Sequence, residues 1–271
     1  MVQLLALDLD DTLLRADLTI SDRNLRALKA AEEMGVRIVL ASGRVVPAME
    51  RYAEQLGLFE RPGYMISENG STVTATLPRA LLRQYTIARA LLLQLFEAFE
   101  VLDLPVQVYR EKTILVTAPN VQTGADMKIS GFNCQVVPDL AERIDFDPTK
   151  LVIPGDPEIL PMARDVIRQA FGDQVHAFIS KPYFLEILPI QADKGNALRY
   201  VADTLGISRD DVMAIGDAGN DLGMIQFAGW GVAMANGTEE VRNAARVVTS
   251  LTHDDDGVAE AVERYLLGNR G

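Results

Sequence analysis

The sequence predicts an α/β protein in which a parallel sheet is interrupted by a second, smaller α+β unit. Two observations carry this prediction. Short apolar runs alternate with amphipathic stretches at both ends of the chain, which is typical of parallel strands joined by crossover helices. Between them, short β-rich runs follow one another with few residues in between, which is typical of antiparallel strands. We expect the first domain over residues 1–82 and 191–271 and the inserted domain over residues 83–190.

The composition is that of a globular protein with one large or two ordinary domains: 271 residues, of which 48% are hydrophobic and 24% charged. The net charge of −12 argues against nucleic acid or an anionic membrane as a partner. A single cysteine, Cys134, excludes an intramolecular disulfide. The first residues lack the basic region of a signal peptide, and no apolar run approaches the ~18 residues of a membrane span. We therefore expect a cytoplasmic protein.

The first third of the chain alternates strand and helix. Residues 3–8 form an apolar run that is too short for a helix, so we predict a buried strand. Residues 21–35 begin with a Ser cap, repeat apolar residues at helical spacing and end in Gly, which predicts a helix. The same alternation predicts a strand at 36–42, a helix at 45–57 and a strand at 64–70 that ends in a turn.

The pattern changes after about residue 82 and returns at residue 193. The middle segment predicts helices at 87–102 and 157–171, strands at 106–110, 113–117 and 150–155, and a hairpin of strands 175–180 and 183–190. The returning alternation predicts strands at 211–217, 230–236 and 246–250 and helices at 194–206, 219–229, 238–245 and 256–267.

Polar clusters stand near the carboxyl ends of the predicted parallel strands, where open α/β sheets bind ligands. Asp8, Asp10 and Thr12 follow the first strand. The two carboxylates could serve as a nucleophile and as a general acid and base. A carboxylate that attacks a phosphoryl group meets a repulsion of about 4 kcal/mol per charge pair at ~4 Å and an effective dielectric of ~20. Magnesium, which prefers oxygen ligands, would offset it. The alternative is a solvated Asp-rich turn.

Two further clusters carry hydroxyl, glycine and basic residues. Ser42, Gly43 and Arg44 end the second strand, where a hydroxyl and backbone N–H groups could hold phosphate and a Gly allows close approach. The alternative for Ser42 is a helix cap. Lys194 opens a helix, which is an unfavourable place for a cation unless a buried phosphate or carboxylate faces it. The alternative is a solvated lysine.

The last cluster lies on a strand-to-helix turn that contains Asp217, Asn220 and Asp221. The two carboxylates could hold a hard cation, directly or through water. The alternative is an Asx turn with a helix cap. His253 lies in a later loop, where it could touch substrate or metal, although a solvated histidine is the simpler interpretation.

As an ordered set, DLDDTL (8–13), SGR (42–44), Lys194 and GDAGND (216–221) resemble the motifs of the haloacid dehalogenase superfamily of phosphohydrolases. The insertion before Lys194 resembles the type II (C2) capped members. SENGS (67–71) and the stretches LEILP…DKGNAL and GVAMANGTEEVRNAARVVTS…DDDGVAEAV resemble the Cof-type class IIB subgroup. This resemblance covers essentially the whole chain and implies a Rossmann-like core with an inserted α+β C2 cap.

The resemblance also implies a role for each matching residue. Asp8 would be the nucleophile that forms an aspartyl-phosphate, and Asp10 would protonate the leaving oxygen and then activate water. Phosphate or substrate would be bound by Ser42, Gly43, Arg44, Lys194 and Asn220, with Arg44 at a position that faces the cap. Mg²⁺ would be held by Asp8, the backbone carbonyl of Asp10 and Asp217, with Asp221 as a direct ligand or close by.

The chain is thus expected to be a magnesium-dependent phosphoric monoester hydrolase that acts on sugar phosphates or phosphorylated cofactors, as a monomer or homodimer. A sugar-phosphate phosphotransferase or phosphomutase and a non-catalytic phosphate-metabolite binding protein are the alternatives. A dinucleotide-binding protein is disfavoured because no G-x-G-x-x-G follows the first strand. Candidate residues for substrate choice lie in the cap: Tyr109, Arg110, Lys181, Tyr183 and Glu186.

Overall fold

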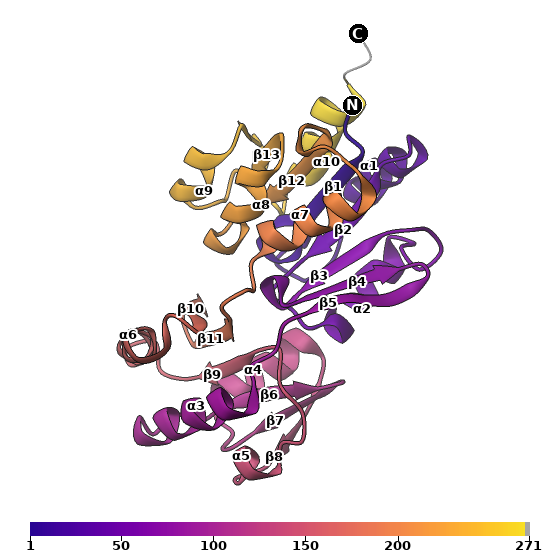
Figure 1. Cartoon of the computed structure of the whole chain (residues 1–271). Helices are drawn as coiled ribbons and strands as arrows, with labels where there is room; N and C mark the ends of the chain where they lie inside the picture. The colour runs from indigo at the N-terminus through magenta and orange to yellow at the C-terminus, as the bar shows by residue number, and fades with distance from the viewer. Residues whose placement is uncertain (269–271) are drawn as a thin grey trace. The chain divides into compact units, whose positions relative to one another are not determined.

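The computed structural model describes residues 1–268 and divides the chain into two compact units. The first, here called the core unit, comprises Met1–Arg83 and Asp193–Gly271. The second, the inserted unit, comprises Gln84–Ala192. Each unit has its own sheet (Figure 1). Each also has its own apolar core.

The core unit is built on an eight-stranded sheet in the order β14-β13-β12-β1-β2-β3-β4-β5. Its strands are β1 (Leu4–Asp8), β2 (Arg37–Ala41), β3 (Tyr64–Ser67), β4 (Thr72–Thr76), β5 (Arg79–Gln84), β12 (Val212–Gly216), β13 (Trp230–Ala233) and β14 (Val247–Val248). The strands from β14 to β3 are parallel, and β4 turns back antiparallel to β3. The carboxyl ends of β12, β1 and β2 therefore lie side by side at one edge of the sheet.

Helices cover both faces of this sheet, which explains why β1 is buried along its whole length. They are α1 (Asp22–Glu33), α2 (Val46–Gln55), α7 (Lys194–Leu205), α8 (Leu222–Phe227), α9 (Glu239–Ala244) and α10 (Gly257–Ala261). Leu5 and Leu7 of β1 pack in the cluster that includes α1, α2 and α10. Leu4 and Ala6 pack in the cluster that includes α7 and α8. This alternation follows from the two-residue period of a strand.

The inserted unit is built on a six-stranded sheet in the order β10-β11-β9-β6-β7-β8. Its strands are β6 (Gln107–Arg110), β7 (Thr113–Val116), β8 (Asn133–Val136), β9 (Leu151–Pro154), β10 (Val175–Lys181) and β11 (Phe184–Pro189). Its helices are α3 (Arg89–Val101), α4 (Val121–Ser130), α5 (Leu140–Arg143) and α6 (Leu160–Phe171). Phe99 of α3 and Ile167 of α6 share one apolar cluster with alternate residues of the sheet, such as Val108 and Ile153.

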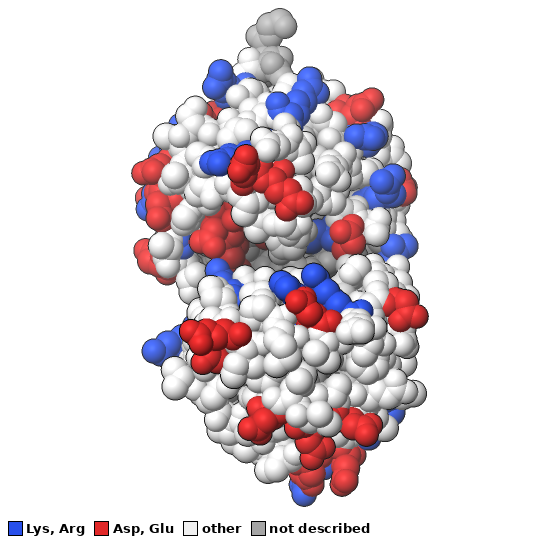
Figure 2. Space-filling view, turned by 90° about the vertical axis from the view of Figure 1, so that its left-hand side faces the viewer, with Lys and Arg blue, Asp and Glu red and all other residues white. Residues whose placement is uncertain are grey.

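The predicted elements are present with shifted ends. Among the described residues, the structure adds five strands and α-helices that the sequence pattern did not identify, β4, β5, α4, β8 and α5, besides the short helical turns Leu9–Leu13 and Arg209–Asp211. The predicted helix at 219–229 is a short 3₁₀ turn, Gly219–Asp221, followed by α8. No helix among the described residues is long and apolar enough to cross a membrane. Within each unit, acidic side chains are interspersed with basic ones on the face seen in Figure 2.

Candidate active site

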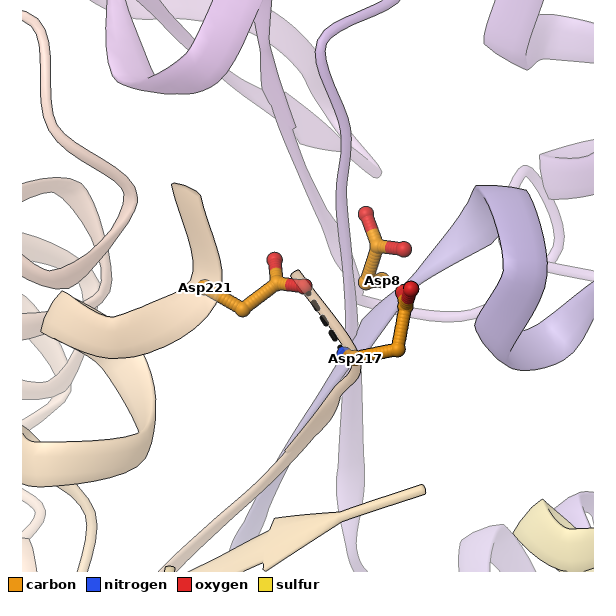
Figure 3. A group of neighbouring side chains, drawn as sticks. All are labelled: Asp8, Asp217 and Asp221. Carbon is orange, nitrogen blue, oxygen red and sulfur yellow. Dashed lines mark hydrogen bonds between the residues drawn. The ribbon is translucent and has the colours of Figure 1, made fainter. Parts of the chain in front are cut away.

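Three carboxylates and one ammonium group form a buried cluster at the carboxyl ends of β1 and β12. Lys194 Nζ, at the start of α7, lies 2.6 Å from Asp8 Oδ1 and 2.7 Å from Asp221 Oδ1. Asp217 completes the cluster, and one carboxylate oxygen from each of the three aspartates lies within 4.8 Å of the others (Figure 3). The side chains of Lys194 and Asp221 are fully buried. The alternatives of a solvated turn and a solvated lysine are therefore wrong for these residues.

Short-range contacts hold the carboxylates in place. Thr12 Oγ1 donates a hydrogen bond of 2.9 Å to Asp217 Oδ1. Asp221 Oδ2 accepts from the backbone N–H groups of Asp217 at 3.0 Å and of Ala218 at 3.1 Å, and the first of these bonds is drawn in Figure 3. With Lys194 on Oδ1, both oxygens of Asp221 are engaged. Gly216 is needed because a Cβ there would lie 2.6 Å from the Asp221 side chain.

Burial and mutual repulsion shift the ionisation of this cluster. Burial, aided by the charge of Asp221, raises the pKa of Asp8 well above its ordinary value. The same two causes raise the pKa of Asp217 to about 7. Burial acts against the charged form of Lys194, but the carboxylates of Asp221 and Asp8 outweigh it and raise the pKa of the ammonium group.

The donor set suits a divalent cation. Three ionised aspartates and one lysine leave the buried cluster with a net charge of −2, and uncompensated buried charge is strongly unfavourable. Carboxylate oxygens are ligands that Mg²⁺ prefers, and Mg²⁺ is commonly bound through one or two carboxylates and substrate phosphate. Lys194 contacts one oxygen of Asp8, and Thr12 donates to one oxygen of Asp217. The second oxygen of each of these two carboxylates could therefore serve as a ligand.

Asp10 is directed to Arg44. The guanidinium makes two contacts with the Asp10 carboxylate, 2.9 Å from Nε to Oδ2 and 2.6 Å from Nη2 to Oδ1. This two-point geometry fixes the plane of the carboxylate, as a lysine could not. Arg44 is itself anchored, because its backbone N–H donates to Ser42 Oγ at 3.1 Å. Burial opposes the charge of Arg44, yet the hydrogen bonds and charge of Asp10 raise the pKa of the guanidinium.

The remaining predicted phosphate-binding groups lie beside a turn to which the sequence assigned no role. Asn220 Nδ2 donates a hydrogen bond of 2.8 Å to Asn69 Oδ1. Gly43 lies against the same side chain, since a Cβ on Gly43 would be 3.1 Å from Asn69 Nδ2. Asn69 is 4% exposed. The residues E-N-G at the end of a predicted strand were the available signal, because Asn and Gly favour the left-handed backbone of tight turns.

A family model for haloacid dehalogenase-like hydrolases matches residues 5–262. The chain belongs to the haloacid dehalogenase-like hydrolase family. An HMP-PP phosphatase of Enterobacter sp. (strain 638) is 30% identical, over 87% of this chain and 85% of that protein. A crystal structure of a haloacid dehalogenase-like hydrolase from Bacteroides thetaiotaomicron is 33% identical with a TM-score of 0.91, over 97% of this chain and 99% of that one.

A structure of a HAD subclass IIB sugar phosphatase has a TM-score of 0.80 over 97% of this chain and 99% of that one, at 21% identity, and so shows the shared fold alone. The predicted family and fold class, a Rossmann-like core with an inserted α+β cap, are thereby confirmed. The inserted unit is the cap of this haloacid dehalogenase-like hydrolase.

The cap carries a buried polar cluster that includes two of the five candidate residues for substrate choice. Asp126 Oδ2 accepts hydrogen bonds from Tyr109 Oη at 2.5 Å and from Gln107 Nε2 at 2.9 Å. Lys150 Nζ lies 3.4 Å from Glu186 Oε2 and 5.1 Å from the centre of the Tyr109 ring. The structure therefore brings Tyr109 and Glu186 together.

The other three candidates in the cap are Arg110, Lys181 and Tyr183. Arg110 pairs with the exposed Asp145 and covers the ring of Phe146. Tyr183 stacks edge-on against Phe184, and Lys181 ends β10.

A second asparagine that the sequence did not single out links the first loop of this hydrolase to a later one. Asn236 Nδ2 donates to the backbone carbonyl of Asp11 at 2.8 Å, and Asn236 Oδ1 accepts from the backbone N–H of His253 at 3.0 Å. The side chain of His253 is 15% exposed, with Nε2 3.7 Å from Asp11 Oδ1. His253 is therefore a packed loop residue beside Asp11, and a freely solvated histidine is the wrong interpretation.

Proposed function

We propose that this chain is a magnesium-dependent phosphatase that hydrolyses small phosphorylated metabolites through an aspartyl-phosphate on Asp8. The observation that carries the proposal is the buried carboxylate of Asp8 at a strand end, 2.6 Å from a buried lysine and beside two further carboxylates. A purely structural cluster would be more stable with fewer charges, since buried ion pairs seldom outweigh apolar replacements. Sugar phosphates and phosphorylated cofactors are the substrate classes, in keeping with the phosphatase names of the relatives.

The reaction would proceed in two displacements at phosphorus. An oxygen of Asp8 attacks, the bond from phosphorus to the ester oxygen breaks, and Asp10 gives its proton to that leaving oxygen. Water then attacks the aspartyl-phosphate, Asp10 takes the proton of the water, and phosphate leaves with Asp8 restored. In the structure Arg44 contacts both oxygens of the Asp10 carboxylate and fixes its plane, so one of these contacts must open before that oxygen can carry the proton for the leaving group. Lys194, Ser42 and the Gly43 loop would hold the oxygens of the phosphoryl group, and Asn220 would orient it.

Mg²⁺, when bound, would neutralise the negative charge that the phosphoryl group and Asp8 bring together. We propose Asp8, the backbone carbonyl of Asp10 and Asp217 as its ligands. Asp221 would serve beside them as a positioning residue, because its Oδ1 faces Lys194 and its Oδ2 accepts two backbone N–H groups. Replacement of Asp221 should therefore change the position of Lys194 and should also weaken metal binding at Asp217.

The test is phosphate release from a panel of sugar phosphates and phosphorylated cofactors, in Mg²⁺ and in EDTA, by the wild type and Asp8→Asn. We expect release that needs Mg²⁺ and disappears in the variant. Since burial raises the pKa of Asp8, ionised Asp8 is costly, and the neutral Asn variant should be at least as resistant to urea as the metal-free wild type. Asp22→Asn, on the exposed first turn of α1, is the matched control and should keep wild-type activity. An active Asp8→Asn enzyme would refute the proposal.

The phosphotransferase alternative makes a different prediction in the same assay. A mutase would hold the aspartyl-phosphate until a second sugar accepted it, so free phosphate would appear only slowly when a single substrate is present. The cytoplasmic location and the monomeric or homodimeric state stay predictions from the sequence, to be tested by fractionation and by light scattering.

A further inference from the structure

The turn between β3 and β4 has an unusual backbone for its residues. Glu68, Asn69 and Gly70 are consecutive and all have positive φ, of 46°, 52° and 98°. Such a conformation is unfavourable for a glutamate and persists only where the surroundings impose it. Here Glu68 N–H donates to the carbonyl of Arg44 at 2.9 Å, and Asn69 N–H donates to the carbonyl of Ser42 at 3.0 Å. The turn is thus tied to the loop that ends β2.

The same turn also meets the other loops of the site. A Cβ on Gly70 would lie 2.4 Å from the backbone carbonyl oxygen of Asp193, so the turn packs directly against the residue before Lys194. The side chain of Asn69 covers Gly43 and accepts the hydrogen bond of Asn220. One buried residue, Asn69, is therefore in contact with both the β2 loop and the β12 loop.

We propose that Asn69 is a positioning residue, which holds the carboxamide of Asn220 in the orientation that binds the phosphoryl group; this inference rests on the proposed phosphatase function. Asn220 lies on the exposed first turn after β12, where its side chain would otherwise sample several rotamers. Asn69 is buried and its backbone is fixed by Ser42, so it can hold Asn220 before substrate arrives. Because the Asn220 side chain is then already ordered, substrate binding does not have to offset the entropy lost in fixing its rotamer.

The Asn69→Gly variant tests the carboxamide of Asn69 without changing the backbone of the turn. Glycine adopts a φ of 52° without strain, so the turn is kept while the carboxamide is removed. We expect KM, and the competitive inhibition constant of inorganic phosphate, to rise by about three- to tenfold, the size of one lost hydrogen bond, with a smaller change in kcat. The matched control is Asp103→Gly, at an exposed residue of the cap with a φ of 54°, which should change neither constant.

The decisive experiment is a double-mutant cycle with Asn220→Ala. If Asn69 acts through Asn220, then Asn69→Gly should change the phosphate inhibition constant by less than about twofold once Asn220 is absent. The positioning role would be overturned if Asn69→Gly raised the phosphate inhibition constant equally with and without Asn220, or raised it in neither case. It would also be overturned if Asn69→Gly lowered kcat and the melting temperature together. The phosphatase function would stand in each of these cases. A wild type that releases no phosphate from the panel would instead overturn the proposed function, and this inference with it.

Discussion

Replacing Lys194 with methionine should destabilise the core unit strongly and should make its stability depend on Mg²⁺. The Lys194 ammonium contacts two buried carboxylates at 2.6 and 2.7 Å, and each contact is worth about 6 kcal/mol by Coulomb's law at an effective dielectric of ~20. Most of that attraction offsets the desolvation of the three ions. Methionine roughly matches the length of the side chain but removes its charge and its two hydrogen bonds, leaving three carboxylates together.

The net loss should be about 3–5 kcal/mol, the range seen when one partner of a buried pair is removed. This is a large share of the roughly 5–15 kcal/mol that holds a typical protein folded. A divalent cation would supply part of the missing positive charge. Mg²⁺ should therefore raise the melting temperature of Lys194→Met by more than it raises that of the wild type, because the ligand binds the folded state alone.

The assay is thermal and urea unfolding of both proteins in EDTA and in Mg²⁺. Lys150→Met is the matched control, because Lys150 is another buried lysine, 6% exposed and 3.4 Å from Glu186, but lies in the cap. Lys150→Met should also be less stable than the wild type, but Mg²⁺ should shift its melting temperature by the same amount as that of the wild type. The reasoning is refuted if Lys194→Met unfolds like the wild type in EDTA, or if Mg²⁺ shifts all three proteins equally.

Three further changes test other contacts. Arg44→Lys loses the two-point contact with Asp10, so kcat should fall by about tenfold in steady-state assays, and an unchanged kcat would contradict the role of Arg44. Burial raises the pKa of Asp126 in the folded cap, so the free energy of unfolding should fall as the pH rises above about 4 and Asp126 has to ionise inside the fold. Urea unfolding should show Asp126→Asn to be more stable than the wild type at neutral pH but not below pH ~4. Greater stability of the variant at every pH would contradict this cause. Gly216→Ala places a Cβ 2.6 Å from the Asp221 side chain, so it should lose about 1–3 kcal/mol of stability and most activity, and a wild-type melting curve would contradict the packing.

The predicted site could be located from the sequence because parallel strands bring their carboxyl ends to one edge of a sheet. That rule brings Asp8, Ser42 and Asp217 together without any knowledge of side-chain rotamers. It says nothing about where a side chain points. The pairing of the Arg44 guanidinium with Asp10 could therefore not be predicted from the sequence, and the cap-facing position that the family resemblance implies for Arg44 stays a prediction.

The elements missed in the sequence have weak patterns for physical reasons. β5 and β8 are largely exposed, so they lack the apolar run that marks a buried strand. The residues of β4, TVTAT, are small and mostly polar, although they are buried in the sheet. α4 contains Gly124 and few buried residues, so no apolar stripe marks it as a helix.

The basic side chains of the site are already paired with its carboxylates, and this pairing affects how phosphate can bind. Among the described residues of the core unit, Lys194 and Arg44 are the basic side chains that pair with the site aspartates Asp8, Asp10 and Asp221. Two cations against the four aspartates at positions 8, 10, 217 and 221 leave a net charge of −2 when all are ionised. At a pH high enough to ionise Asp8 and Asp217, whose pKa values are raised by burial, a phosphate dianion would therefore be repelled by the metal-free site, despite the lysine and the arginine.

Phosphate and Mg²⁺ should consequently bind together. One unit charge pair at ~4 Å and an effective dielectric of ~20 is worth about 4 kcal/mol, so inorganic phosphate should bind roughly a hundred- to a thousandfold more weakly in EDTA than in Mg²⁺. Titration calorimetry of the Asp8→Asn protein under both conditions provides the control. Removal of one carboxylate should recover part of the affinity in EDTA, because the repulsion falls with each negative charge removed. Equal affinity of the wild type with and without Mg²⁺ would show that the two buried cations suffice, and the carboxylate cluster would then need another explanation.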